Sequence, residues 1–499
     1  MNKDKKSPHV GNTFDDDRSN SPTRPEWAVC PVCHGQGRVS RRPSRKARLR
    51  HKHQLFAAEK RNASELPTPP AAHIDDCAHC RGAGLKESTT AALPNASPPS
   101  PPSHPSVAII GGGLGGLALA VACRHRGIPF TVYERDEHFD QRSQGYGLTM
   151  QQASKALEGF GISKLHEGIY SAKHVVHRPD GTVVGEWGFR KWGRTDAKIL
   201  PRRMNVHIAR QSLRNELLQA LGGHDMVQWN HRFLSYQECE DHVDLSFQVG
   251  HGASVKKVQA DIVVGADGIR SSVRKQLIGD DVSPLRYLDC MVILGICPLK
   301  SLDDSPLLDG ETLFQTANGN ERIYMMPYSS TSIMWQLSFP LLEDEAKELN
   351  RLGPQALKEE AIRRCPAWHN PIPQILAETP VLFISGYPAY DRDILTSELL
   401  PTESRITLMG DAAHPMSPFK GQGANQALLD ALSLARTIYK ADAIDENSEK
   451  KALREFEAEM LPRSAVKVKA SAEAARFLHT DIAICEGDMP RGTAAELNS

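Results

Sequence analysis

The chain has no excess charge of either sign. Its 60 Lys and Arg residues balance 60 Asp and Glu residues, so the formal net charge is +0. Because no overall field attracts a polyanion or an anionic lipid surface, the composition does not favour binding to nucleic acid. Long apolar runs are also missing, and no stretch reaches the roughly 18 residues that a membrane span requires. We therefore expect no membrane span.

The N-terminus also lacks an apolar segment. It begins Met-Asn-Lys-Asp-Lys-Lys-Ser and continues into three consecutive aspartates at 15–17. This pattern does not match a secretory signal, and it does not match an acid-poor transit peptide. The ten cysteines form no disulfide framework either, because four make two CxxC pairs and six are scattered. Such usage suits a metal and buried thiols in a reducing compartment, so a cytoplasmic location is expected.

The rest of the composition predicts a globular protein of several parts. At 499 residues and 40% hydrophobic content, the chain can bury a substantial core. Residues 1–29 are polar and rich in Pro, Ser and Asp, and are predicted to be disordered. A Cys-containing unit at 30–85 and a Pro- and Ser-rich linker at 86–105 follow. The main domain is expected at 106–445, and a C-terminal helix and tail at 446–499.

A strand followed by a glycine-rich turn opens the main domain. The segment Val107–Ile110 precedes Gly111, Gly113 and Gly116, which have the spacing GxGxxG, and an Ala- and Leu-rich helix follows. The first glycine permits a tight turn, the second lets the backbone approach a pyrophosphate, and the third allows close packing of helix on strand. Glu134 ends the next strand, where its carboxylate would accept hydrogen bonds from ribose hydroxyls. By itself this fingerprint leaves FAD and NAD open.

Two further glycine-aspartate turns follow apolar strands. Gly265-Ala-Asp267-Gly ends one strand, and Gly410-Asp411 ends the other, with a Pro- and Gly-rich loop leading to a helix near Gly423. A carboxylate and the free amides of a helix start suit a polyol chain, and glycines let the backbone approach a flat ring. The last turn is therefore interpreted as the flavin end of an FAD site.

Together the three motifs resemble the class A flavoprotein monooxygenases, the p-hydroxybenzoate hydroxylase group, over about 106–480. Within the group the chain is most similar to tetracycline-inactivating and salicylate- or urate-hydroxylase-like members. The resemblance implies an α/β fold: a Rossmann-like FAD-binding domain, an inserted β-sheet-rich substrate domain at about 281–400, and a C-terminal helix. It also implies that NAD(P)H reduces FAD and that a flavin hydroperoxide then delivers an oxygen atom from dioxygen to an aromatic or polycyclic molecule. Neither the nicotinamide nor the oligomeric state is predicted.

The resemblance also assigns roles to residues. It implies that Glu134 binds the adenosine ribose, that Arg210 lies near the pyrophosphate and ribityl chain, and that Asp411 binds the ribityl hydroxyls. NAD(P)H is expected to dock near Asp267, His414 is interpreted as structural, and no side chain is assigned a catalytic role. The predicted cofactor-binding residues are Gly111, Gly113, Gly116, Glu134, Arg135, Arg142, Gly147, Arg210, Asp267, Asp411, Gly423 and Ala424. Candidate pocket residues, for which core packing is the alternative, are Met326, Tyr328, Trp335, Gln336 and Phe339.

Two short repeats precede the main domain, and both read CxxCxGxG. They contribute four thiols, from Cys30, Cys33, Cys77 and Cys80. A two-residue gap lets both thiolates of a pair reach one metal, and two pairs supply four sulfurs for tetrahedral zinc. Each repeat resembles the zinc repeats of DnaJ-type cochaperones, which carry four repeats and two zincs, so one site is expected here. Free thiols and a site shared between two copies are the alternatives, and the basic stretch at 41–53 is interpreted as a solvated loop.

Two other functions remain open at this stage. A flavin reductase or halogenase would use the same core, although the Trp-x-Trp-x-Ile-Pro halogenase signature is absent from the sequence. A zinc-bearing, redox-sensing binding protein would use the core as a scaffold. Coupling of NAD(P)H oxidation to an oxygenated product separates the hydroxylase from the binding protein.

Overall fold

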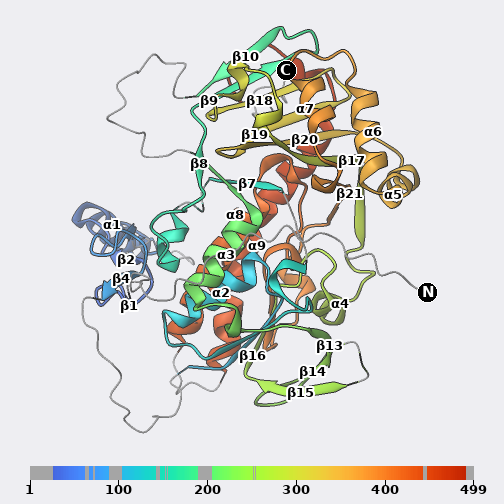
Figure 1. Cartoon of the computed structure of the whole chain (residues 1–499). Helices are drawn as coiled ribbons and strands as arrows, with labels where there is room; N and C mark the ends of the chain where they lie inside the picture. The colour runs from blue at the N-terminus through green and yellow to red at the C-terminus, as the bar shows by residue number, and fades with distance from the viewer. Residues whose placement is uncertain are drawn as a thin grey trace.

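A nucleotide domain, a large sheet beside it and a small Cys unit make up the computed structural model (Figure 1). In Figure 1 the Cys unit, in blue, lies at the side of the nucleotide domain, and the large sheet lies at the opposite end from β13 to β15. The structure describes residues 26–61, 67–70, 73–88, 104–141, 146–151, 153, 155–188, 205–250, 252, 254–441 and 447–490.

A five-stranded parallel sheet is the centre of the nucleotide domain. Its two central strands read Val-Ala-Ile-Ile and Ile-Val-Val-Gly, and every residue in them is buried. Continuous apolar runs are typical of parallel strands that are covered on both faces. All neighbours are parallel, so the strands end at a common edge. In order across the sheet the strands are β12 (Val227–Gln228), β6 (Phe130–Tyr133), β5 (Val107–Ile110), β16 (Ile262–Gly265) and β22 (Ile406–Leu408).

Helices cover this sheet, and two of them begin at its carboxyl edge. Helix α2 (Leu114–Arg124) follows β5, and α8 (Gly423–Lys440) follows the loop after β22. The predicted C-terminal helix is α9 (Ser448–Phe477), which continues through Pro462. No described helix has the length and apolar character that a membrane crossing demands. The remaining helices of this domain are α3 (Arg210–Leu221) and α4 (Ser272–Ile278).

Two small antiparallel sheets flank the parallel one. The strands of the first are β7 (Gly147–Met150), β11 (Val206–Ala209) and β8 (Ile169–Tyr170). Those of the second are β13 (His231–Glu238), β14 (Val243–Val249) and β15 (Val255–Ala260).

A seven-stranded sheet forms most of the region predicted as an insertion at 281–400. Two of its strands, β9 and β10, come from 173–187 instead, because β9 pairs in parallel with β18. Helices α5 (Glu343–Leu352), α6 (Pro354–Arg364) and α7 (Ile372–Glu378) pack on one face. In order the strands are β10 (Val183–Trp187), β9 (Lys173–His177), β18 (Thr312–Ala317), β19 (Arg322–Ser329), β20 (Ser332–Pro340), β17 (Leu285–Pro298) and β21 (Ile384–Arg392).

The Cys unit extends beyond its predicted bounds. Strand β1 (Glu26–Val29) falls in the segment predicted to be disordered and pairs with β4 (Leu85–Ser88), while residues 1–25 lie outside the described chain. A second pair joins β2 (Arg38–Arg41) to β3 (His73–Asp76). The basic stretch was predicted to be a loop, but most of it belongs to helix α1 (Arg45–Lys60). Lys, Arg, Ala, Leu and Gln are good helix formers, which accounts for the difference.

Candidate active site

The first glycine turn is packed tightly at two positions and open at the third. Gly111 has φ +113°, and a Cβ there would lie 2.4 Å from the carbonyl oxygen of Ala266. A Cβ on Gly116 would lie 1.9 Å from the carbonyl oxygen of Gly111. On Gly113, by contrast, it would meet only an Nη atom of Arg210, at 4.0 Å. The open position stands at the N-terminus of α2, where free amides suit a phosphate.

Two charged side chains bind the backbone of this turn. Glu134, at the end of β6, accepts hydrogen bonds from the amides of Gly112 (2.6 Å) and Asp136 (3.0 Å). The buried Arg214 donates from Nε to the carbonyl oxygen of Gly112 (2.9 Å). Arg214 was not predicted, although it stands one helical turn after Arg210 among apolar residues of α3. Arg135 is exposed beside Glu134, and Arg142 lies outside the described residues.

Buried charges hold the last turn. Asp430 of α8 accepts hydrogen bonds from the amide of Gly410 (2.9 Å), from His414 Nε2 (2.7 Å) and from Arg463 (2.9 Å). Burial alone would raise the pKa of Asp430, but the adjacent His414 and Arg463 outweigh it and lower that pKa. Asp430 therefore stays ionised and fixes the backbone before Asp411. This arrangement supports the structural interpretation of His414.

Asp411 faces an open space between two helix starts. Its Oδ1 lies 3.5 Å from where a Cβ on Gly423, the first residue of α8, would be. The side chain is accessible to solvent although protein surrounds it, and burial raises the pKa of its carboxyl against the opposing pull of His414 and Arg210. Gly113, Arg210, Asp411 and Gly423 thus border one cradle. A carboxylate and two helix N-termini fit the ribityl chain and pyrophosphate of FAD.

The middle turn links the other two. Asp267 Oδ2 accepts hydrogen bonds from the amides of Ser272 (2.7 Å) and Val273 (3.3 Å) at the start of α4. Its Oδ1 is buried without a partner, and burial raises the pKa of the carboxyl. Arg274 of α4 donates to the carbonyl oxygens of Ala412 (3.0 Å) and Ala413 (2.9 Å). The third turn is therefore fastened to the second by a residue that the sequence motifs did not indicate.

One face of the seven-stranded sheet is turned toward the cradle. The ring of Tyr146 lies 5.7 Å from the guanidinium of Arg210 and also packs with Met326 and Met334. A Cβ on Gly147 would lie 2.7 Å from Met326 Cε, so β7 passes directly against this face. Residues that alternate along β19 share one face of the sheet. The apolar cluster here is Leu313, Met326 and Met334, with Tyr146, Ile296, Tyr324 and Tyr328 packed against it.

The prediction of pocket residues was wrong for two of the five. Trp335 and Phe339 belong to the face that α5 to α7 cover, because side chains alternate along β20. Trp335 is fully buried there and donates from Nε1 to Thr379 Oγ1 (2.9 Å). Ala424, in the first turn of α8, packs against the core of the nucleotide domain.

Arg322 is a polar residue on the cradle-facing side that the sequence did not reveal. It is buried and donates from Nε and an Nη atom to Gln315 Oε1, at 2.9 and 2.6 Å. Its guanidinium lies 5.2 Å from the ring of Tyr324, and burial lowers its pKa to about 10. No carboxylate within the described residues pairs with it. Side chains alternate along β19, which places Arg322 on the same side as Tyr324 and Met326. This alternation could have predicted the position of Arg322 from the sequence.

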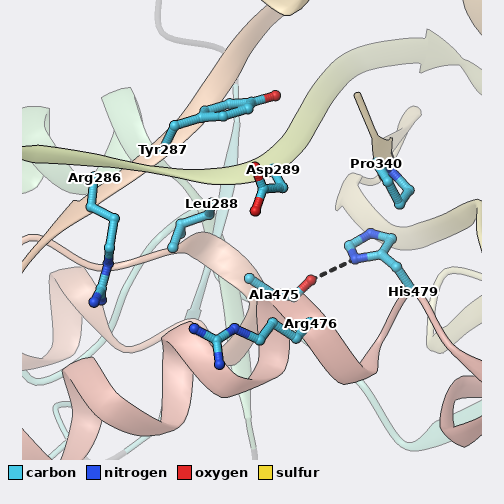
Figure 2. Close-up of a pocket in the computed structure, with 8 residues that line it drawn as sticks. All are labelled: Arg286, Tyr287, Leu288, Asp289, Pro340, Ala475, Arg476 and His479. Atoms are coloured by element: carbon cyan, nitrogen blue, oxygen red, sulfur yellow. Dashed lines mark hydrogen bonds between the residues drawn. The ribbon is translucent and has the colours of Figure 1, made fainter. Parts of the chain in front are cut away.

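A separate cavity of about 170 Å³ lies between β17 and the end of α9 (Figure 2). His479 projects into it from α9's end and bonds from Nδ1 to the carbonyl oxygen of Ala475 (2.7 Å). None of the predicted cofactor-binding residues borders it, so this cavity is not the cradle. Its lining residues are Arg286, Tyr287, Leu288, Asp289, Pro340, Ala475, Arg476 and His479.

The four predicted metal ligands come together in the Cys unit. Their sulfurs all lie within 4.8 Å of one another, with Cys30 and Cys77 4.0 Å apart and Cys33 and Cys80 3.7 Å apart. A tetrahedron of thiolates around zinc has edges of about 3.8 Å. The amides of Gly37 and Gly84 point at Cys33 and Cys80 at 3.1 and 3.2 Å, as donors that stabilise thiolates. The donor set fits one zinc ion.

The family model described as FAD binding domain matches residues 104–471. The chain belongs to that family. A relative in Trichoderma harzianum, FAD-dependent monooxygenase thnD, is 28% identical over 391 residues, which cover 74% of this chain and 92% of the relative. A 6-hydroxynicotinate 3-monooxygenase of Bordetella bronchiseptica is 25% identical over 340 residues, covering 66% of this chain and 82% of that protein. These names agree with the resemblance inferred from the three motifs.

Solved structures show the same fold. The structure of Klebsiella pneumoniae HpxO complexed with FAD and uric acid superimposes with a TM-score of 0.63 at 22% identity, covering 79% of this chain and 90% of that one. The predicted α/β FAD-binding fold with an added sheet and a C-terminal helix is therefore confirmed. FAD is confirmed as the cofactor of the family.

Proposed function

We propose that this chain is an FAD-dependent monooxygenase that uses NAD(P)H and dioxygen to hydroxylate an aromatic small molecule. The observation that carries the proposal is the position of Tyr146, which borders both the cradle and the apolar face of the seven-stranded sheet. A flat ring held at the flavin end of the cradle then has an apolar surface beside it on which a second flat ring can rest. The names of the relatives support the same reaction class.

Bound FAD would supply hydride acceptance and oxygen activation. The chain's own residues would bind the cofactor, place a positive dipole near its ring and exclude water. Asp411 would accept hydrogen bonds from the ribityl hydroxyls, and the amides at the start of α8 would place a positive dipole at the ring end of the cofactor. Met326 and Met334 would keep water away from the reacting face.

The substrate we propose carries an acidic or phenolic group on its ring. Arg322 supports this, because a buried guanidinium without a carboxylate partner favours an anion beside it. The relative that acts on 6-hydroxynicotinate has a name that denotes a hydroxylated aromatic acid. The edge between Asp267 and the cradle is where we place the docking of NAD(P)H.

A substrate screen tests the proposal. Purified protein loaded with FAD should oxidise NAD(P)H several-fold faster with a hydroxylated aromatic acid than without it. Arg322→Met should raise KM for acidic substrates by about 10-fold to 100-fold, the loss of one charged hydrogen bond, with less effect on the neutral analogue. Equal effects on acidic and neutral analogues would refute the anionic substrate class. The absence of stimulation by any aromatic compound would contradict the hydroxylase and favour a reductase or a redox-sensing protein.

We also propose that Cys30, Cys33, Cys77 and Cys80 hold one zinc ion and that the protein works in the cytoplasm. Support for both comes from the cysteines, all ten of which are free thiols. Metal analysis should find about one equivalent of zinc in the wild type and none in Cys33→Ser. The matched control is Cys485→Ser, an exposed thiol outside the cluster, which should retain the metal.

A further inference from the structure

The Cys unit is packed against the nucleotide domain through backbone carbonyls of its own metal-binding turns. Arg126, two residues past the end of α2, donates to the carbonyl oxygen of Gly35 (3.2 Å). Arg436 of α8 donates to the carbonyl oxygens of Gly82 (3.1 Å) and Ala83 (3.2 Å). Gln36 returns a hydrogen bond from its Nε2 to the carbonyl oxygen of Arg436 (3.0 Å).

These two arginines lack the partners that buried guanidinium groups usually have. Arg126 is 3% exposed and Arg436 is half-buried, and neither makes an ion pair within the described residues. The Nε atoms of both have no hydrogen-bond partner. Asp76 is the acid near Arg436, but its carboxylate is bound to Lys155 Nζ (2.5 Å). An uncompensated buried charge destabilises a fold by several kcal/mol, so a nearby negative group is expected.

The metal site can be that negative group. Four thiolates around one Zn²⁺ carry a net charge of about −2. Arg126 and Arg436 together carry two positive charges, and their guanidinium groups contact the turns on which Cys33 and Cys80 stand. The charges of these two arginines offset the charge of the metal-bound site, and the third nearby cation, Arg38, is exposed and screened by solvent.

The same two arginines stand on the two helices that form the cradle. Helix α2 begins beside Gly113 and ends just before Arg126, whose guanidinium also binds the carbonyl oxygen of Ala122 (3.0 Å). Helix α8 begins at Gly423 and carries Arg436 near its end. The helices pack on each other, since a Cβ on Gly115 would lie 3.5 Å from Ala427 Cβ. The Cys unit is therefore in contact with the far ends of both helices.

We propose that the zinc-loaded Cys cluster neutralises Arg126 and Arg436 and thereby holds α2 and α8 in the arrangement that binds FAD. FAD retention then depends on a metal remote from the cradle. This inference rests on the proposed zinc site and on the FAD cradle of the proposed function. It gives the Cys unit a role in a flavoprotein that none of the nucleotide motifs requires.

Removal of the metal is the first test. The double variant Cys33→Ser/Cys80→Ser should lose zinc, bind FAD at least tenfold more weakly in a flavin fluorescence titration, and exchange amide hydrogens faster in α2 and α8. Cys485→Ser should change none of these. If the variant fails to fold, a chelator applied to the folded wild-type holoenzyme gives the same readouts. Zinc loss with an FAD dissociation constant within twofold of wild type and unchanged exchange would overturn the proposal.

Removal of the charges is the second test and does not involve FAD. Arg126→Met/Arg436→Met should lower the affinity for zinc at least tenfold in competition with a chromophoric chelator. Arg363→Met, an exposed arginine on α6, is the matched control and should leave zinc affinity unchanged. Unaltered zinc affinity in the double variant would overturn the charge balance. Because this experiment reads only zinc, its result stands even if the proposed monooxygenase activity fails.

Discussion

Different forces hold the two ends of the FAD cradle. At the first turn, backbone packs directly on backbone, and Gly111 and Gly116 leave no room for a Cβ. At the last turn, the buried carboxylate of Asp430 accepts hydrogen bonds from the amide of Gly410, from the ring of His414 and from the guanidinium of Arg463. Close backbone packing limits the first turn, which Glu134 and Arg214 also bind, whereas the last turn depends mainly on buried charge.

The difference has consequences for how each end fails. A turn in which backbone packs directly on backbone is disrupted by added atoms. A turn held by buried charges tolerates small changes of shape but not the loss of one charge, which leaves the others uncompensated. Substitutions at the two ends should therefore change stability and FAD binding in different ways. The four experiments below test this difference, from the largest expected effect to the smallest.

Asp430→Asn should have the largest effect. It removes the negative charge that pairs with Arg463 and accepts a hydrogen bond from His414, so the free energy of unfolding should fall by about 3–5 kcal/mol. Denaturant titration followed by circular dichroism measures this. Asp280→Asn, at an exposed carboxylate paired with Lys275, is the control and should change stability little. A loss below about 1 kcal/mol for Asp430→Asn would mean that the last turn does not depend on buried charge.

Gly116→Ala tests the steric end. Its new Cβ meets the carbonyl oxygen of Gly111 at 1.9 Å, so the backbone must move, at a loss of about 2–3 kcal/mol in stability. Gly113→Ala is the matched partner, because its Cβ enters open space. That variant should fold as well as the wild type and bind FAD more weakly, as measured by thermal melting and flavin titration. Equal melting temperatures for the two variants would contradict the steric account.

Asp411→Asn separates ligand binding from stability. The amide keeps the shape of the side chain but accepts hydrogen bonds less strongly, so the FAD dissociation constant should rise about 10-fold to 100-fold. Stability of the apoprotein should not fall, because burial already raises the pKa of this carboxyl and disfavours its charge. Flavin fluorescence and apoprotein melting give the two values. Destabilisation of the apoprotein would place Asp411 with Asp430 as a structural charge.

Glu457→Gln should have the smallest effect, and it depends on pH. Glu457 accepts a hydrogen bond from Thr407 in β22 (2.7 Å), and burial raises its pKa from 4.5 to about 7. The folded state therefore binds the proton of Glu457 more tightly than the unfolded chain does. The stabilisation of the folded state by this proton is fully present below pH 4.5 and is lost as the pH rises through 7. Melting temperatures should show Glu457→Gln more stable than wild type at pH 8, by about 1–2 kcal/mol after allowance for partial exposure, and equal near pH 4.5. A pH-independent difference would contradict this.

The same contrast explains what the sequence could and could not predict. Gly111, Gly113 and Gly116 lie within six positions of one another, so their spacing and flanking strand predicted the nucleotide fold directly. Asp430, Arg463 and Arg274 reach the last turn from 16 to 139 positions away, and only tertiary packing brings them there.

The facing sheet shows the same limit. Alternation along β20 predicts that Trp335 and Phe339 share a face but cannot say which face the helices cover. The parallel pairing of β9 with β18 joins segments more than 130 positions apart, which no local pattern indicates. The Cys cluster was predicted from its spacing, whereas its contacts with Arg126 and Arg436 were not.

Isotope labelling of the product is the most direct test of the proposed function. Holoenzyme supplied with NAD(P)H, a stimulating aromatic substrate and ¹⁸O₂ should yield a product whose mass rises by one ¹⁸O atom. NAD(P)H should be consumed in step with it. A product that takes its oxygen from water, or NAD(P)H consumption that yields only hydrogen peroxide with every aromatic compound tested, would contradict the assignment of this chain as an FAD-dependent monooxygenase.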